Sequence, residues 1–117
     1  LAAVGVERAR GFSVNVSAYG PDAGEQQYGE QVAALLGGAH FVIDSSRNGA
    51  GGTTEWCNPP GQALGLPPAG TTDGTPLDGH LWIKPPGESD GTCNGGPPAG
   101  TFWPERAVEL ARNAGWH

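Results

Sequence analysis

Positive charge is scarce in this sequence, which excludes several classes of partner. Six Lys and Arg stand against twelve Asp and Glu, giving a formal net charge of −6. The basic residues are scattered, so no cationic face is available to neutralise phosphates, and we expect neither nucleic acid nor an anionic membrane as a partner. The sequence also lacks an apolar run approaching the roughly 20 residues of a membrane-spanning helix.

Cysteine is scarce as well. Cys57 and Cys93 belong to neither a CxxC motif nor a Cys/His cluster, so their pattern gives poor support for a metal site. A disulfide between them would close a loop of about 36 residues, stabilise the fold by roughly 3–4 kcal/mol and imply an oxidising compartment. Two free thiols are the alternative that this spacing leaves open.

Residues 1–11 lack the basic start and apolar run of a signal peptide, and the chain begins with Leu1 rather than Met. Its 117 residues suffice for one domain at most. We therefore expect a processed or truncated piece of a longer protein. If that protein is secreted, its targeting segment lies upstream or has been removed.

Glycine and proline, by contrast, are abundant, with 21 and 11 residues. Such a composition approaches that of disordered, low-complexity chains. Here the two residue types cluster between short apolar, β-branched or aromatic runs, which is typical of long ordered loops between strands.

Three short apolar runs, each ending in a polar or charged residue, predict buried strands at 12–16, 41–43 and 81–83. Apolar residues at helical spacing predict a helix over 24–36, and Gly37 and Gly38 supply its stop. A second helix is predicted over 103–113, with Pro104 near its first turn. This alternation is typical of an α/β fold with a parallel sheet or barrel.

A long connection over 49–79 interrupts the alternation. Compact domains rarely carry a structureless connection beyond about 12–15 residues unless it is functional or disordered. Trp56 and Cys57 lie in its first third. We interpret the connection as a functional loop that a disulfide holds in place.

Polar side chains follow each predicted strand. Because ligands of α/β folds gather at the carboxyl ends of parallel strands, we expect these side chains to converge on one mouth. They are Asn15 and Ser17, then Asp44, Ser46 and Arg47, and finally Lys84, Glu88 and Asp90.

The last set lies in a loop that two prolines stiffen, and it carries carboxyl groups suited to glycoside hydrolysis. Inverting glycosidases use a proton donor and a base whose carboxyl groups are roughly 6.5–9.5 Å apart. Glu88 and Asp90 are the candidates, and a neighbouring Arg47 or Lys84 would hold a carboxylate ionised. The alternative is a structural ion-pair network or a solvated loop.

The tryptophan and histidine positions can also be interpreted as either functional or structural. Trp56, in a Gly/Pro-rich loop, is predicted to offer a flat platform for a sugar ring, with a satellite core under the loop as the alternative. Trp82 and Trp103 are predicted core residues. His40 and His80, which precede predicted strands, are predicted to be structural.

Several motifs resemble glycoside hydrolase family 6. They are FVIDSSRNG at 41–49, EWCNPPG at 55–61, LWIKPPGESDGTC at 81–93 and FWPE at 102–105, preceded by GFSVNVS at 11–17. Their order agrees with that of the family, and the resemblance covers nearly the whole chain, from about Gly11 to Ala114. Residues 1–117 thus resemble the C-terminal part of a single catalytic domain of this family.

The resemblance implies a distorted, incomplete β/α barrel, with the substrate cleft across the carboxyl ends of its strands. It also implies inverting hydrolysis of β-1,4-glucosidic bonds, without metal or organic cofactor. Asp90 corresponds to the family's aspartate near the cleavage subsite, which acts as the base or in a water-holding system. The other corresponding residues are the sugar contacts Lys84 and Glu88, the glucose platform Trp56, the polar cleft residue Asn15, the charged partners Arg47 and Lys84, the strand-end acid Asp44, and a disulfide between Cys57 and Cys93.

Two departures from the family pattern limit this correspondence. The family's general acid lies in an upstream Arg-Asp-Cys motif that this chain does not contain, so we expect the chain alone to be inactive. Gln62 stands where relatives often have Arg, so no cationic sugar contact is expected there.

The short connection between Cys93 and Phe102 favours an open cleft and endo action, because processive exo-acting relatives usually carry a longer loop that roofs a tunnel. We expect a secreted, extracellular endo-β-1,4-glucanase that acts on β-1,4-glucan and is monomeric when complete. An exo-acting cellobiohydrolase of the same family and a non-catalytic carbohydrate-binding domain are the alternatives.

Overall fold

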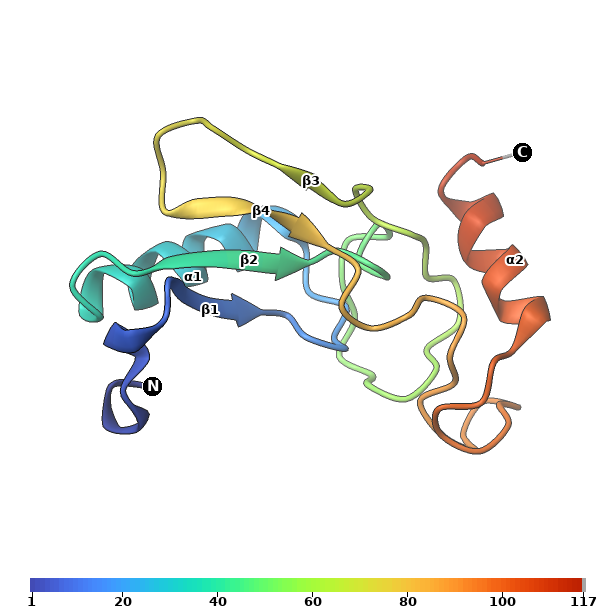
Figure 1. The fold of residues 1–117 in the computed structure, drawn as a ribbon. Coiled ribbons are helices and arrows are strands. Elements are labelled where there is room, and N and C mark those ends of the chain that lie inside the picture. The colour runs from blue at the N-terminus through green and yellow to red at the C-terminus, as the bar shows by residue number, and fades with distance from the viewer. Residues whose placement is uncertain (117) are drawn as a thin grey trace.

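The computed structural model describes residues 1–116 and contains one sheet, two α-helices and long loops (Figure 1). Two 3-10 turns begin the chain, followed by four strands and the helices. In chain order these elements are η1 (Ala2–Val4), η2 (Val6–Arg8), β1 (Gly11–Val14), α1 (Asp22–Leu35), β2 (His40–Asp44), β3 (Ala69–Gly70), β4 (Leu77–Leu81) and α2 (Pro104–Asn113).

The strands lie in the order β1-β2-β4-β3. β1, β2 and β4 are parallel neighbours, and the short β3 pairs with β4 in the antiparallel direction. The expected parallel sheet is therefore present, with an antiparallel strand at one edge. Figure 1 shows the arrowheads of β1, β2 and β4 pointing toward the end where the long loops and α2 lie.

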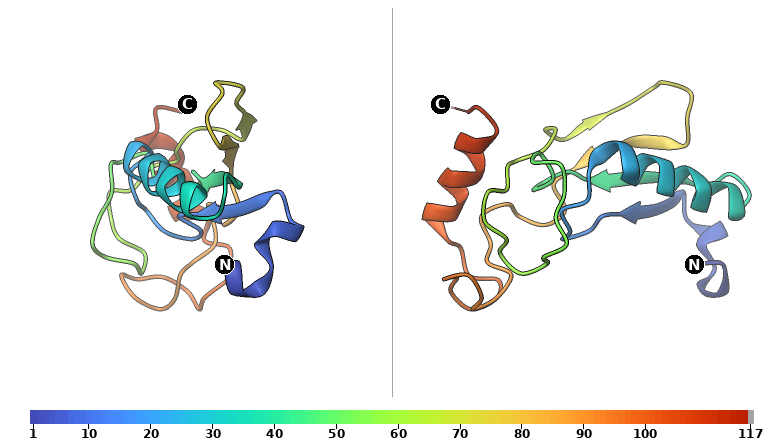
Figure 2. Two further views of the ribbon diagram at one scale, coloured as in Figure 1. Left: turned by 90° about the vertical axis from the view of Figure 1, so that its left-hand side faces the viewer. Right: turned by 180° about the vertical axis from the view of Figure 1, so that it is seen from behind.

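Helix α1 covers one face of the sheet (Figure 2). Its buried residues are Gly29 and Ala33, and the core beneath them contains Val14, Phe41, Ile43 and Leu77. Gly29 permits a close approach, because a Cβ atom built there would lie 2.3 Å from Cε2 of the buried Phe41 ring. The small residues of α1 thus allow a large aromatic ring to fill the space between helix and sheet.

Both predicted helices are confirmed, and their ends differ from the prediction by at most two residues. α1 occupies Asp22–Leu35 and is followed by Gly37 and Gly38, whose positive φ angles of 73° and 93° stop the helix. α2 begins at Pro104, where the missing N–H costs no helical hydrogen bond. Neither helix in residues 1–116 is long and apolar enough to cross a membrane.

The predicted third strand at 81–83 is wrong, since β4 is Leu77–Leu81. The apolar pattern of this strand is hidden because its polar residues have partners within the fold: Asp78 forms an ion pair with Arg10 and contacts His40, and His80 contacts Asp22 at 2.9 Å. These contacts agree with a structural role for both histidines.

The first strand is also shorter than predicted, because β1 ends at Val14. Asn15 and Ser17 have positive φ angles of 62° and 61°, which extended strands do not allow. The Asn15 side chain fixes this bend: its oxygen accepts the N–H of Gly20, and its amide donates to the carbonyl of Asp44.

Trp82 and Trp103 were predicted to be core residues, and this is also wrong. Both are half-buried and lie outside the core cluster. The Trp82 indole donates to the carbonyl of Leu66 and lies 6.2 Å from the ring of Trp116, while Trp103 lies under the Arg106 guanidinium. The amphipathic indole places these residues at the border between packed and exposed surface.

The contact between α1 and β2 predicts that Gly29→Ala destabilises the protein. Alanine favours a helix interior by about 1 kcal/mol over glycine, but the added methyl overlaps the buried Phe41 ring, and overpacking typically costs about 1–3 kcal/mol. We expect a lower midpoint of urea unfolding. Gly24→Ala is the control, because its Cβ meets only Pro21 at 3.6 Å; equal midpoints for the two variants would contradict the packing.

Candidate active site

Asp44 joins the ends of the three parallel strands. It is the last residue of β2 and is buried, and its carboxylate accepts three backbone N–H groups. The donors follow β1, β2 and β4 respectively: Ser17 at 3.0 Å, Ser46 at 3.0 Å and Lys84 at 3.1 Å. The expected convergence of the strand ends is therefore present, and Asp44 lies at its centre.

Arg47 and Asp90 form a buried ion pair just beyond this centre. Nη1 of Arg47 donates to both carboxylate oxygens of Asp90 at 2.8 and 2.9 Å, and the two side chains are only 3% and 6% exposed. Nη2 of Arg47 also donates to the carbonyl of Ser17. A charge pair this deeply buried is held by further hydrogen bonds, which both partners have here.

The Asp90 carboxylate accepts two further donors. The Tyr19 hydroxyl donates to Oδ2 at 2.6 Å, and the backbone N–H of Asn58 donates to the same oxygen at 3.0 Å. Burial by itself would raise the pKa of Asp90, but the donors from Tyr19 and Asn58, together with the Arg47 guanidinium, lower it below the ordinary value. Asp90 is therefore ionised at neutral pH.

Lys84 adds a second cation. Its Nζ atom lies 3.8 Å from Oδ1 of Asp90 and 3.9 Å from Oε2 of Glu88. Lys84 lines the same cleft as Asp90, but Glu88 does not and instead lies behind it, beside Arg47 and Arg106. The structure thus brings Lys84 and Asp90 together in one cleft and leaves Glu88 outside its lining.

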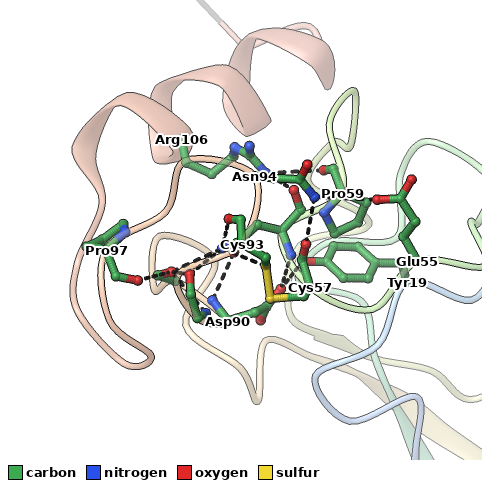
Figure 3. The surroundings of a disulfide bond; sticks show 12 residues. Tyr19, Glu55, Cys57, Pro59, Asp90, Cys93, Asn94, Pro97 and Arg106 are labelled. Carbon is green, nitrogen blue, oxygen red and sulfur yellow. Dashed lines mark hydrogen bonds between the residues drawn. A yellow bond between two sulfur atoms is a disulfide. The ribbon is translucent and has the colours of Figure 1, made fainter.

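Asn58 ties the loop around Asp90 to the loop that carries Trp56, next to the disulfide whose surroundings Figure 3 shows. Its side-chain oxygen accepts the N–H of Asp90 at 2.9 Å, and its amide donates to the carbonyls of Gly91 and Cys93. Asn58 is 2% exposed and has a φ angle of 47°, which asparagine tolerates better than most residues. The adjacent disulfide between Cys57 and Cys93 joins the same two loops.

These loops enclose a cleft of about 500 Å³. Trp56 stands at its wall with 73% of its surface exposed, which excludes the satellite core as its place. The lining residues are Asn15, Ser17, Ala18, Tyr19, Gly20, Glu25, Thr53, Thr54, Glu55, Trp56, Lys84, Ser89, Asp90 and Ala99.

Three residues of the site were missed by sequence reasoning. Tyr19 and Asn58 hold Asp90, and Glu25 lines the cleft from the first turn of α1, where burial raises its pKa. Asn58 lies inside the EWCNPPG motif, so its position was visible but its partners were not. Tyr19 and Glu25 carried no signal, because only the fold brings them to the strand ends.

No group of three His, Cys, Asp or Glu side chains in residues 1–116 is placed to hold a metal ion. The cations of the site are instead Arg47 and Lys84, both close to Asp90.

The sequence profile of glycosyl hydrolases family 6 matches residues 1–114. The chain belongs to this family. The profile match covers all the site residues described above, from Asn15 to Ala99.

Individual members of the family show how similar this chain is to known proteins and solved structures. Endoglucanase A of Cellulomonas fimi is 57% identical over 113 residues, which make up 97% of this chain and 25% of that protein. The structure of the endoglucanase Cel6 from Mycobacterium tuberculosis in complex with methyl-cellobiosyl-4-deoxy-4-thio-β-D-cellobioside matches with a TM-score of 0.92 and 54% identity, over 98% of this chain and 41% of that one. A less similar relative, the 1,4-β-D-glucan cellobiohydrolase CEL6B of Podospora anserina, is 35% identical over 90% of this chain and 31% of that protein. The chain thus spans about a quarter to two fifths of these family members.

The contacts of Asn58 predict that Asn58→Ala is strongly destabilising. Its removal leaves the N–H of Asp90 without a partner, at a cost of about 1–3 kcal/mol. It also takes one donor from the carbonyls of Gly91 and Cys93, which keep the Ser89 hydroxyl and the Gly96 N–H respectively. Asn94→Ala is the matched control, because Asn94 has nearly the same φ angle, 49°, but an exposed side chain. Chemical denaturation should show a loss at Asn58 at least about 1 kcal/mol larger than at Asn94; equal losses would mean that only backbone strain matters.

Proposed function

We propose that this chain is part of a longer enzyme that hydrolyses internal β-1,4-glucosidic bonds of cellulose or soluble β-glucan, with inversion at the anomeric carbon. The observation that carries the proposal is the cleft, whose lining combines the exposed Trp56 with the ionised Asp90. An indole face suits the apolar C–H face of a pyranose ring, while Lys84 supplies hydrogen-bond donors for its hydroxyls. Asn15 lines the cleft, and its carboxamide holds the backbone bend that shapes this wall. A neutral glucan is also compatible with the net charge of −6.

Asp90 is proposed to act through its fixed negative charge. The transition state of glycoside hydrolysis resembles an oxocarbenium ion, so a carboxylate that stays ionised beside it is stabilising. Both oxygens of Asp90 already accept hydrogen bonds, and its pKa is lowered, which makes it a weak proton acceptor. We therefore propose that Asp90 stabilises the developing charge and orients the attacking water, rather than keeping the proton of that water.

The proton donor is proposed to lie outside this chain, in the Arg-Asp-Cys segment that the family resemblance implies. Glu25 and Glu55 also line the cleft, but neither belongs to a segment that resembles that motif. Residues 1–117 alone are therefore proposed to be inactive. We further propose an extracellular location, which the disulfide between Cys57 and Cys93 supports.

Endo action is favoured by two observations. The relatives at 57% and 54% identity are endoglucanases by name, whereas the cellobiohydrolase is 35% identical. The segment between Cys93 and Phe102 is also short. It folds back so that Ser89 pairs with Gly100 and Thr101, and it contributes one residue, Ala99, to the lining of the cleft.

The proposed role of Asp90 predicts a large loss of turnover in Asp90→Asn of the longer enzyme, because the substitution removes the charge and keeps the size. Loss of a preorganised electrostatic group typically lowers kcat by about 100- to 1,000-fold. With the unsubstituted longer enzyme, proton NMR of a cello-oligosaccharide digest should show the inverted anomer as the first product. The viscosity of carboxymethylcellulose should fall early relative to the release of reducing ends.

Asp73→Asn, an exposed change in the loop before β4, is the control and should retain full turnover. A retained anomer would overturn the inverting mechanism, and slow loss of viscosity with steady release of short sugars would favour the exo-acting alternative.

The proposed platform predicts that Trp56→Ala weakens binding of β-1,4-linked oligosaccharides about tenfold, equivalent to about 1.4 kcal/mol. Isothermal titration calorimetry or tryptophan fluorescence measures the change. Trp116→Ala is the control, because Trp116 also has a large exposed surface but lies outside the cleft. Unchanged affinity in Trp56→Ala would remove Trp56 from the site, whereas binding by a longer protein that never hydrolyses the sugar would favour a carbohydrate-binding domain.

A further inference from the structure

Tyr19 contacts both members of the buried ion pair. It lies in the segment between β1 and α1 and is 4% exposed. Its hydroxyl donates to Oδ2 of Asp90 at 2.6 Å, and its ring lies under the Arg47 guanidinium, whose Cζ atom is 4.3 Å from the ring centroid. One side chain therefore holds the anion by its polar tip and the cation by its apolar face.

We propose that Tyr19 is a positioning residue that sets the acid limit of activity, because its hydroxyl holds Asp90 in the ionised, correctly oriented form. The proposal rests on the proposed function of Asp90. The hydroxyl of Tyr19 is already engaged with Asp90, so it acts on the reaction through this carboxylate.

The chemistry of the two groups fixes the direction of the effect. Burial, followed by the hydrogen bond to Asp90, raises the pKa of Tyr19 well above its ordinary range, so the phenol keeps its proton throughout the working pH range. A phenol donates a stronger hydrogen bond to a carboxylate than to a neutral carboxylic acid. Its contact therefore favours ionised Asp90, and its removal raises the pKa of that group.

Other charges near Asp90 stay in place when the hydroxyl is removed. Arg47 is paired with it at 2.8 Å and Lys84 lies 3.8 Å away, while Glu88 approaches Lys84 at 3.9 Å. Arg106, on α2, donates to the carbonyl of Asn58 behind Tyr19. Because Phe keeps the ring under Arg47, Tyr19→Phe isolates the effect of one O–H group.

The experiment compares Tyr19→Phe with the parent in the longer enzyme. Tyr28→Phe is the matched control, since Tyr28 is the other tyrosine of residues 1–117 and is 56% exposed on α1. The carboxyl carbon of Asp90 is titrated by ¹³C NMR, with Asp90→Asn identifying its signal, and the pH dependence of kcat and KM on a cello-oligosaccharide is measured in parallel.

In Tyr19→Phe, the pKa of Asp90 should rise by about one unit, the size expected for a hydrogen bond to a charged group. The acidic limb of the kcat profile should move to higher pH by the same amount, while kcat at the optimum and KM change less than about threefold. Tyr28→Phe should leave the titration and the profile unchanged.

A second variant changes the hydroxyl in the opposite direction without removing it. Fluorotyrosine placed at position 19 alone, by suppression of a stop codon introduced there, keeps the hydroxyl, and its more acidic phenol is a stronger donor. The titration of Asp90 and the acidic limb should then move to lower pH.

A uniform fall in kcat with neither the titration nor the limb displaced would assign Tyr19 a packing role and overturn the proposal. If Tyr19→Phe does not fold, the fluorotyrosine titration decides in the same way. If the parent enzyme hydrolyses no β-glucan, the proposed function fails, and the NMR titration still tests the effect of Tyr19 on Asp90.

Discussion

The buried ion pair between Arg47 and Asp90 is the interaction on which the rest of the site depends. Two charges that are 3% and 6% exposed are stable only where further groups satisfy them. Tyr19 and Asn58 complete the shell of Asp90, while Ser17 accepts from Arg47. These residues come from three connections of the chain: Ser17 and Tyr19 lie between β1 and α1, Arg47 and Asn58 between β2 and β3, and Asp90 between β4 and α2. Satisfying one charge pair therefore fixes the positions of three segments at once.

This constraint explains how so many glycines and prolines coexist with an ordered cleft. The loops have little regular hydrogen bonding of their own, and buried polar contacts replace it. Asp44 holds the three strand ends by accepting hydrogen bonds from backbone N–H groups. Asn58 joins the loop of Trp56 to the loop of Asp90, and the Cys57–Cys93 disulfide links the same two loops covalently. The exposed indole of Trp56 is thus held beside a carboxylate whose pKa stays low.

The sequence predicted the parts of the fold that follow from local periodicity, and the parts of the site that lie in motifs. Both helices, the parallel sheet and the convergence at Asp44, Lys84 and Asp90 could be anticipated from apolar spacing and strand ends. β4 could not, because its polar residues are neutralised by partners 38 to 68 positions away in the chain. Tyr19 was missed for the same reason, since its partner Asp90 is 71 positions away.

A double-mutant cycle on the unfolding free energy, with Arg47→Met, Asp90→Asn and the double variant, tests this account most directly. Each single change leaves an unpaired buried group and is predicted to cost about 3–5 kcal/mol, whereas the double variant should cost less than their sum by at least about 1.5 kcal/mol. Additive losses would show that the two side chains act independently, and would contradict the ion pair as the contact that holds the site together.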